Sequence, residues 1–252
     1  MDYMTDIWSL IEIKRYQEAK HRIQGAMQEQ PSDAELFFAA AVIENDLGNC
    51  GEAQQLVLEG LSNEPKHHGL RYMHFLVLKE NAEYAEAEEV IISLLNESPS
   101  EPDYLCGYAQ LMMLTFHLEK ARALCDEALR VAPENMKANS TSYLLNICSG
   151  KAAVSDHELQ NIVMQDPESE HTLSLIATDM LEKNKYRQAQ NILQELVRID
   201  PHDQGYIDSA IEIRTLTHWS SLPNWPLNRF GWPASVATVS YTHLTLPTIC
   251  SV

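Results

Sequence analysis

The 252-residue sequence has few basic side chains: 18 lysines and arginines stand against 36 aspartates and glutamates, a net charge of −18. From Leu216 onward the only charged side chain is Arg229, so residues 1–215 carry 17 basic and 36 acidic side chains, a balance of −19. Such a surface repels nucleic acid and anionic membranes. We therefore expect no nucleic-acid partner, and a basic or neutral protein partner if the charge does more than keep the chain in solution.

The sequence also lacks the marks of a zinc site, a membrane span and a secretion signal. No two of the five cysteines stand in CxxC spacing. No apolar run approaches the roughly 18 residues that a membrane helix needs. The first ten residues, MDYMTDIWSL, carry acids where a secretion signal carries lysine or arginine. We expect a cytoplasmic location.

No group of residues predicts catalysis. His67 and His68 have no obvious further metal ligands. The stretch Asp156–Glu158 falls at the start of a predicted helix, where acids favour the helix dipole. Ser149-Gly150-Lys151 lacks the preceding glycine of a phosphate loop. We expect neither an enzyme nor a bound cofactor or metal in this part of the chain.

What the sequence does contain is a regular internal repeat. Six prolines follow one another at one fixed interval: Pro31, Pro65, Pro99, Pro133, Pro167 and Pro201. A fixed period of about 34 residues is typical of a solenoid built from helical hairpins.

Other columns keep the same phase. Twelve positions before the prolines stand small side chains: Ala19, Ala53, Ala87, Ala121, Ser155 and Ala189. Apolar side chains stand eight before them (Ile23, Val57, Ile91, Cys125, Leu159, Leu193) and four before them (Met27, Leu61, Leu95, Leu129, Val163, Val197). This spacing places both apolar sets on one helical face. A further column, earlier in each unit, is expected to line the inner face of each first helix: Ile7, Ala41, Phe75, Ala109, Tyr143 and Ala177.

The pattern predicts two helices per unit. First helices are expected at 3–13, 35–47, 69–81, 103–115, 137–148 and 171–183, and second helices at 16–29, 51–63, 84–97, 118–131, 155–165 and 187–199. Turns are indicated at Leu47-Gly48-Asn49 and Glu182-Lys183-Asn184, and a capping helix from Gln204 to about Thr215. Capping residues are expected at Ser32-Asp33, Ser100-Glu101, Glu134-Asn135 and His202-Asp203. The unit that ends at Pro167 departs most from the pattern, so we expect local irregularity there.

These residues resemble the tetratricopeptide repeat family over residues 1–215. The stretches that carry the resemblance are Tyr16-Gln17-Glu18-Ala19, Leu47-Gly48-Asn49 with Glu52-Ala53, Tyr84-Ala85-Glu86-Ala87 and Tyr186-Arg187-Gln188-Ala189. The family's usual first-helix glycine is missing from every unit. The resemblance implies an all-α fold, an α-solenoid of six hairpins in a right-handed superhelix whose concave side is lined by the first helices.

The resemblance also implies binding of extended peptides or single helices on that side. The candidate partner-binding residues are Phe38, Val42, Asp46, Tyr72, Leu76, Lys79, Glu80, Gln110 and Met113. Some family members bind a chaperone's C-terminal carboxylate with lysine, arginine and asparagine, but the equivalent positions here are Phe38, Val42, Tyr72, Leu76 and Cys106. An apolar groove rimmed by acids favours a basic or amphipathic segment. Alternatively, the aromatic residues only contact neighbouring repeats.

The C-terminal residues are of a different kind. The predicted linker 216–237 has three tryptophans, three prolines and no acid. Such residues suit a membrane interface, and the segment resembles the link to membrane helices in some bacterial repeat proteins; an extended tail on the last helix is the alternative. Residues 239–252 resemble a translated sequencing adapter, particularly Val239–Thr248. We expect them to be non-native and the natural protein, most plausibly bacterial, to be truncated near Ala237.

Three readings of the function remain. The first is a protein-binding scaffold with an assembly or adaptor role. The second is the cytoplasmic repeat domain of a truncated, membrane-anchored bacterial protein, associated with a membrane through the missing region. The third is the non-catalytic part of an enzyme complex.

Overall fold

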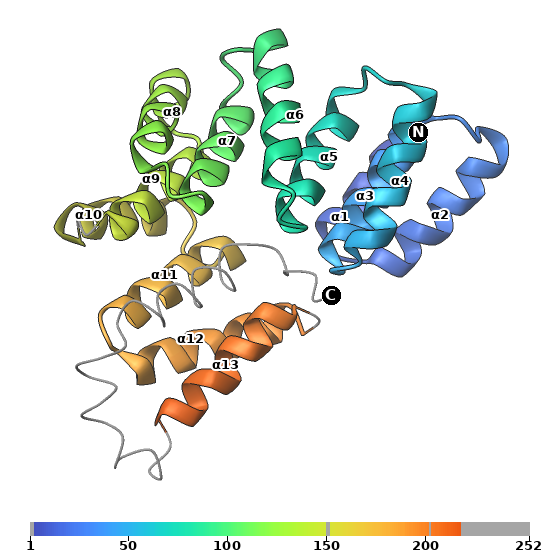
Figure 1. The fold of residues 1–252 in the computed structure, drawn as a ribbon. Coiled ribbons are helices and arrows are strands. Elements are labelled where there is room, and N and C mark those ends of the chain that lie inside the picture. The colour runs from blue at the N-terminus through green and yellow to red at the C-terminus, as the bar shows by residue number, and fades with distance from the viewer. Residues whose placement is uncertain (1–2, 150–151, 202, 218–252) are drawn as a thin grey trace. The chain divides into compact units, whose positions relative to one another are not determined.

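A computed structural model describes residues 3–149, 152–201 and 203–217 of the chain, and these residues form helices and no strand (Figure 1). The chain divides into two compact units between Val131 and Ala132, and each is described by itself. Residues 218–252, with most of the predicted linker and the adapter-like tail, lie outside the described residues. No helix within the described ranges is long and apolar enough to cross a membrane.

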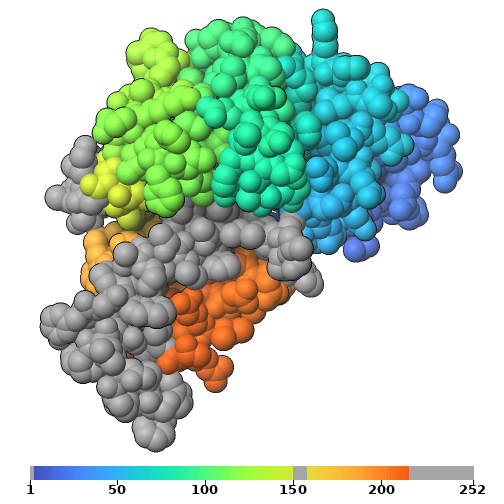
Figure 2. Space-filling view, viewed as in Figure 1, coloured from blue at the N-terminus to red at the C-terminus, as the bar shows by residue number. Residues whose placement is uncertain are grey.

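The first unit contains four helical hairpins. Its first helices are α1 (Tyr3–Glu12), α3 (Ala34–Asp46), α5 (His68–Glu80) and α7 (Pro102–Leu114). Its second helices are α2 (Tyr16–Glu29), α4 (Cys50–Asn63), α6 (Tyr84–Glu97) and α8 (Leu118–Val131). Consecutive hairpins pack without a break along this unit, as the atoms of Figure 2 show. The predicted helix pairs are confirmed.

The second unit contains two further hairpins and a final helix: α9 (Met136–Cys148), α10 (Ala152–Gln165), α11 (Glu170–Glu182), α12 (Tyr186–Ile199) and α13 (Gln204–Thr217). The last helix covers an apolar face of α11 and α12, where Tyr206 and Ile213 pack against Leu181 and Leu196. The predicted capping helix is therefore present. A hydrogen bond of 3.1 Å from the Tyr206 hydroxyl to the Glu170 carboxylate also connects this helix to the preceding hairpin.

The proline period fixes the phase of the second helices. Every second helix begins at the same distance before its proline, as Tyr16 does before Pro31, and each proline lies in the turn that follows. Proline cannot continue the helical hydrogen-bond ladder, so it ends the hairpin. The later start predicted at residue 155 is wrong, because α10 begins at Ala152 in phase with the other second helices. The side chains of residues 151–157 lie outside the description, so the rest of the predicted irregularity is untested.

The small column is buried in the hairpins where its side chain is described. Its described alanines, Ala19, Ala53, Ala87, Ala121 and Ala189, are all 0% exposed. The apolar column eight before the prolines is also buried, from 0% at Val57 to 8% at Leu159. A larger side chain at the alanine column would push the helices apart, since packed interiors have no spare volume.

One predicted column has a different role from the one expected. Ile7, Ala41, Phe75, Ala109, Tyr143 and Ala177 are each 0% exposed. They belong to the packed core and do not line an open inner face. The accessible inner surface is therefore made by the residues that flank this column on each first helix.

Helix starts are capped less uniformly than the sequence indicates. Asp33, Asn135 and Asp203 accept hydrogen bonds from backbone N–H groups in the first turn, as expected of N-caps. Glu101 makes no side-chain cap; Pro102 stands at the start of that helix, where its missing N–H has no cost. Ser169 caps α11, because its hydroxyl accepts a hydrogen bond of 3.2 Å from Thr172 N. The sequence pattern did not indicate this cap.

Among the turns that the structure describes in full, each turn inside a hairpin contains one left-handed residue. Gly48 has φ 75°, and the same phase is occupied by Lys14, Ala82, Phe116 and Asn184 with φ between 56° and 62°. Left-handed backbone suits glycine and asparagine, whereas a Cβ atom costs roughly 1 kcal/mol. Phe116 is the bulkiest of these residues, and its side chain is 82% exposed. Its backbone strain is therefore offset by few packing contacts of the ring.

We predict that Phe116→Gly raises the free energy of unfolding by about 1 kcal/mol, because it removes the left-handed strain and few contacts. Phe116→Ala is the matched control: it removes the same ring but keeps a Cβ atom, so it should leave stability nearly unchanged. Urea unfolding followed by circular dichroism measures both. Equal or lower stability of the glycine variant would show that the ring makes contacts that outweigh the strain.

Candidate functional site

The candidate site lies on the first helices of the first unit. In this unit α1 contacts α3, α3 contacts α5, and α5 contacts α7, in addition to the contacts inside each hairpin. Among the described residues, consecutive second helices make no comparable direct contact. The first helices are therefore the closer-packed inner layer, and the second helices splay apart on the outside.

Aromatic rings connect the inner layer from hairpin to hairpin. The ring centroids of Trp8 on α1 and Phe38 on α3 are 5.3 Å apart, and Phe38 lies 5.9 Å from the His67 ring. Farther along, Tyr72 on α5 lies 5.2 Å from Tyr104 on α7. These four aromatic side chains, Trp8, Phe38, Tyr72 and Tyr104, are half-buried and form what we call the aromatic inner surface. Tilted ring pairs at these separations are favourable.

His67 has a structural role that the sequence did not reveal. Its Nδ1 atom accepts a hydrogen bond of 3.1 Å from Leu70 N, which caps α5. Its Nε2 atom lies 2.9 Å from the Glu35 carboxylate on α3. One ring nitrogen thus caps α5, and the other connects it to the preceding hairpin. No group of three or more potential metal ligands occurs among the described residues.

The structure separates the nine predicted binding residues into three groups by exposure. Asp46 is exposed. Five are half-buried: Phe38, Val42, Tyr72, Leu76 and Gln110. Three are buried: Lys79 at 4%, Glu80 at 8% and Met113 at 5% exposure. A partner on this surface would meet the first two groups directly, and the buried three would act from beneath the surface.

Lys79 is bound by its neighbours. Its ammonium donates a hydrogen bond of 3.3 Å to the side-chain oxygen of Gln110 on α7 and lies 5.7 Å from the centroid of the Phe75 ring. An ammonium over a ring face is attracted by the ring quadrupole. The charge of Lys79 is therefore directed towards α7 and the core.

Glu80 is the most perturbed acid of the inner layer. Burial raises the pKa of its carboxyl to about 8; the Asp46 carboxylate adds to this rise, while Lys79 and the Asn45 amide oppose it. Burial disfavours the charged form of an acid. Below that pH Glu80 keeps its proton, so the acid-rimmed groove expected from the sequence has one fewer negative charge at neutral pH. The spacing of residues along a helix does not reveal this burial.

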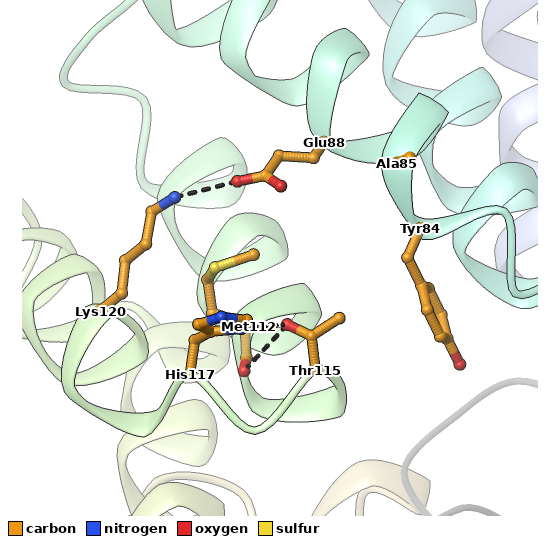
Figure 3. A pocket seen from close by; sticks show the side chains of 7 residues that line it. All are labelled: Tyr84, Ala85, Glu88, Met112, Thr115, His117 and Lys120. Atoms are coloured by element: carbon orange, nitrogen blue, oxygen red, sulfur yellow. Dashed lines mark hydrogen bonds and ion pairs between the residues drawn. The ribbon is translucent and has the colours of Figure 1, made fainter.

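A second cluster, which sequence reasoning missed, lies where α6 meets α7 and α8 (Figure 3). The Glu88 carboxylate accepts hydrogen bonds from the Tyr108 hydroxyl at 2.6 Å and from Lys120 at 2.9 Å. These bonds lower the pKa of Glu88. The cluster borders a cavity of about 160 Å³, also lined by Tyr84, Met112 and His117. Glu88 and Lys120 are too far apart in sequence for any motif to pair them.

The inner layer of the second unit is more polar. Buried hydroxyls of its first helices bond their own backbone, as Thr141 does to Lys137 O at 2.7 Å and Thr178 to Ser174 O at 2.9 Å. Glu158 on α10 accepts hydrogen bonds from Ser142 and Asn146 on α9. These polar groups satisfy one another within the hairpins, so they do not define a binding site.

Comparison with known proteins agrees with this geometry. No protein-family profile matches the chain. Mouse interferon-induced protein with tetratricopeptide repeats 3 is 27% identical over 157 residues, which are 61% of this chain and 38% of that protein. The chain thus matches well under half the length of this curated relative.

Solved structures show the same fold. A tetratricopeptide repeat protein from Parabacteroides merdae superposes with a TM-score of 0.57 at 15% identity, over 97% of this chain and 98% of that one. PilF of Pseudomonas aeruginosa gives 0.57 at 13% identity, over 84% and 95%. The Cut9–Hcn1 hetero-tetramer gives 0.63 at 12% identity, over 84% and 42%. The described residues therefore have the tetratricopeptide repeat fold, and the α-solenoid expected from the proline period is confirmed.

We predict that Glu80→Gln changes how stability depends on pH. The folded state keeps the Glu80 proton up to about pH 8, whereas the unfolded chain releases it near 4.5. Because the folded state binds more protons in this window, Glu80 makes stability fall as pH rises from about 4.5 to 8. The glutamine variant should lose that fall and gain most at pH 8 and above.

Urea unfolding at five pH values between 5 and 9 measures this difference. Glu89→Gln, at an exposed position of α6, is the matched control and should keep the wild-type slope. Parallel curves for the wild type and Glu80→Gln would mean that Glu80 is ionised in the folded protein at neutral pH.

Proposed function

We propose that this chain is a protein-binding scaffold that binds an extended peptide or a single helix of a partner on the aromatic inner surface. The observation that carries the proposal is the row of half-buried rings on consecutive first helices. The exposed carboxylate of Asp46 lies on the same layer, at the C-terminal end of α3. Half-buried aromatic side chains offer a large contact area that is already ordered, so little conformational entropy is lost on binding. Aromatic residues are also enriched at the centres of interfaces.

The partner segment that fits this surface is basic or amphipathic. Aliphatic side chains such as Val42 and Leu76 would contact its apolar face, and the acidic chain attracts its positive charges. A chaperone's C-terminal carboxylate fits poorly, because the five positions equivalent to the family's carboxylate clamp include no cation. An assembly or adaptor role follows from such binding, and no catalytic step is part of the proposal.

Among the similar structures, Cut9 was crystallised in a hetero-tetramer with Hcn1. That complex is a property of Cut9, and it supports the proposal only by showing that a chain of this fold can bind a protein partner. A cytoplasmic location is part of our proposal and is consistent with the strongly acidic charge of the chain.

A second candidate is favoured by one observation. The Trp- and Pro-rich composition of residues 218–237, without acids, suits the interface of a membrane. In this version the same repeats belong to a membrane-anchored bacterial protein, and the scaffold role is unchanged. Recovery of the intact gene tests it: a hydrophobic span shortly after position 237 is the expected result, and a stop codon or soluble continuation there contradicts it.

Selection of displayed random peptides on the immobilised 252-residue chain tests the scaffold proposal. We expect enrichment of sequences that combine aromatic or aliphatic residues with a basic residue. Asp46→Lys should weaken the best peptide about tenfold, which corresponds to roughly 1.4 kcal/mol. Because the attraction is between exposed charges, the loss should shrink at high salt.

Asp126→Lys, the same charge change at an exposed position of the outer helix α8, is the matched control and should leave affinity unchanged. Circular dichroism checks that both variants fold. Failure to enrich any peptide would contradict the scaffold proposal, and equal losses in both variants would place the binding surface away from α3.

A further inference from the structure

Two unsatisfied hydrogen-bond acceptors lie together at the C-terminal ends of α3 and α5. Among the described side chains, Oδ1 of Asn45 and Oε1 of Glu80 are buried and accept no hydrogen bond. The two residues are 6% and 8% exposed. The Asn45 amide is near enough to affect the ionisation of Glu80, as is the carboxylate of Asp46 next to it on α3.

Such atoms are rare in folded proteins. Most buried polar atoms have a partner, and leaving one without a partner destabilises the fold. When Glu80 is ionised, both atoms are acceptors only, so this form of the protein lacks a hydrogen-bond donor at this place. A third acceptor, the carboxylate of Asp46, stands exposed at the edge of the same place.

The polar groups that surround this cluster have partners of their own. Lys79 on α5 directs its ammonium to Gln110 on α7 and to the Phe75 ring. From α4, Sγ of Cys50 lies 3.7 Å from Oε2 of Glu80. The Tyr16 hydroxyl from α2 donates to Asp46 at 3.1 Å and thereby fixes the position of that carboxylate. The charged groups that act on Glu80 are thus Asp46 and Lys79.

We propose that Asn45, Asp46 and Glu80 form a subsite for the guanidinium group of one arginine of the partner segment. The proposal rests on the scaffold function argued above and specifies the chemistry of its partner. A guanidinium has five N–H donors in one plane and no acceptor, so it can bond an amide oxygen and two carboxylates from two helices at once. A lysine ammonium has three donors on one nitrogen atom, so it can reach fewer of these three acceptors at once.

The position of Glu80 allows this contact. It is the last residue of α5, and its carboxyl lies at the end of three rotatable side-chain bonds just beneath the surface. A guanidinium that reaches Asp46 would draw this carboxyl outward as its carboxylate. The Glu80 carboxyl then gives its proton to solvent. An ion pair between the Glu80 carboxylate and the guanidinium replaces the uncharged buried acid. Binding of an arginine should therefore release a proton at neutral pH.

The probes for the test are N-acetyl-arginine amide and its uncharged isostere N-acetyl-citrulline amide, added at millimolar concentrations to the 252-residue protein. NMR of the Asn45 side-chain amide and of the Glu80 carboxyl carbon reports on the subsite. We expect the arginine compound to shift both signals and to lower the Glu80 pKa, and the citrulline compound to do neither.

The pH dependence gives a second readout. With a Glu80 pKa of about 8, the ionised fraction rises from about a tenth at pH 7 to about nine tenths at pH 9, so the affinity for the arginine compound should rise about tenfold. Arginine keeps its charge throughout this range. In Glu80→Gln the rise should disappear, and Asp126→Lys on α8 should retain it.

The outcomes separate this inference from the scaffold proposal. Equal shifts with arginine and citrulline, no shift with either, or a tenfold rise that survives in Glu80→Gln would overturn the subsite. Arginine-specific shifts together with a failure to select any peptide would leave the subsite and overturn the scaffold. Selected peptides that bind Glu80→Gln and wild type equally at pH 9 would retain the scaffold and overturn the subsite.

Discussion

Five of the hairpins depend on a buried alanine twelve positions before the proline. The alanines of this column are completely buried, and a larger side chain there would have no space in the packed interior. The proline then ends the second helix at a fixed distance from that alanine. Because both constraints recur in all four hairpins of the first unit, each hairpin there presents the same faces to the next one, and stacking can continue within that unit.

The inner layer uses the same side chains for stability and for its exposed surface. Phe38 contacts Trp8 in the preceding hairpin and His67 at the start of the following one. His67 in turn caps α5 and bonds Glu35, so one aromatic contact is connected to a helix start and to a polar bond between hairpins. A partner that covers these rings would therefore contact side chains that hold consecutive repeats together. Its binding should reduce the motion of the repeats in the first unit.

Charge acts here through burial as much as through number. The sequence is strongly acidic, yet the acid at the end of α5 is protonated at neutral pH because burial raises its pKa. Glu88 on α6 shows the opposite case, since bonds from Tyr108 and Lys120 lower the pKa of its carboxyl. Two glutamates on neighbouring helices thus differ in charge state because of their surroundings and not because of their chemistry.

The sequence by itself determined the repeat length, the helix pairs and the buried columns, because these follow from periodicity and from proline, which act locally along the chain. It also placed Phe38, Tyr72 and Asp46 on first helices. It could not tell that Lys79, Glu80 and Met113 are buried, that Ile7 and its equivalents belong to the core, or that His67 joins two hairpins. Only the tertiary structure decided these points, since exposure and hydrogen bonding depend on which side chains of neighbouring hairpins, a whole repeat away in sequence, come into contact.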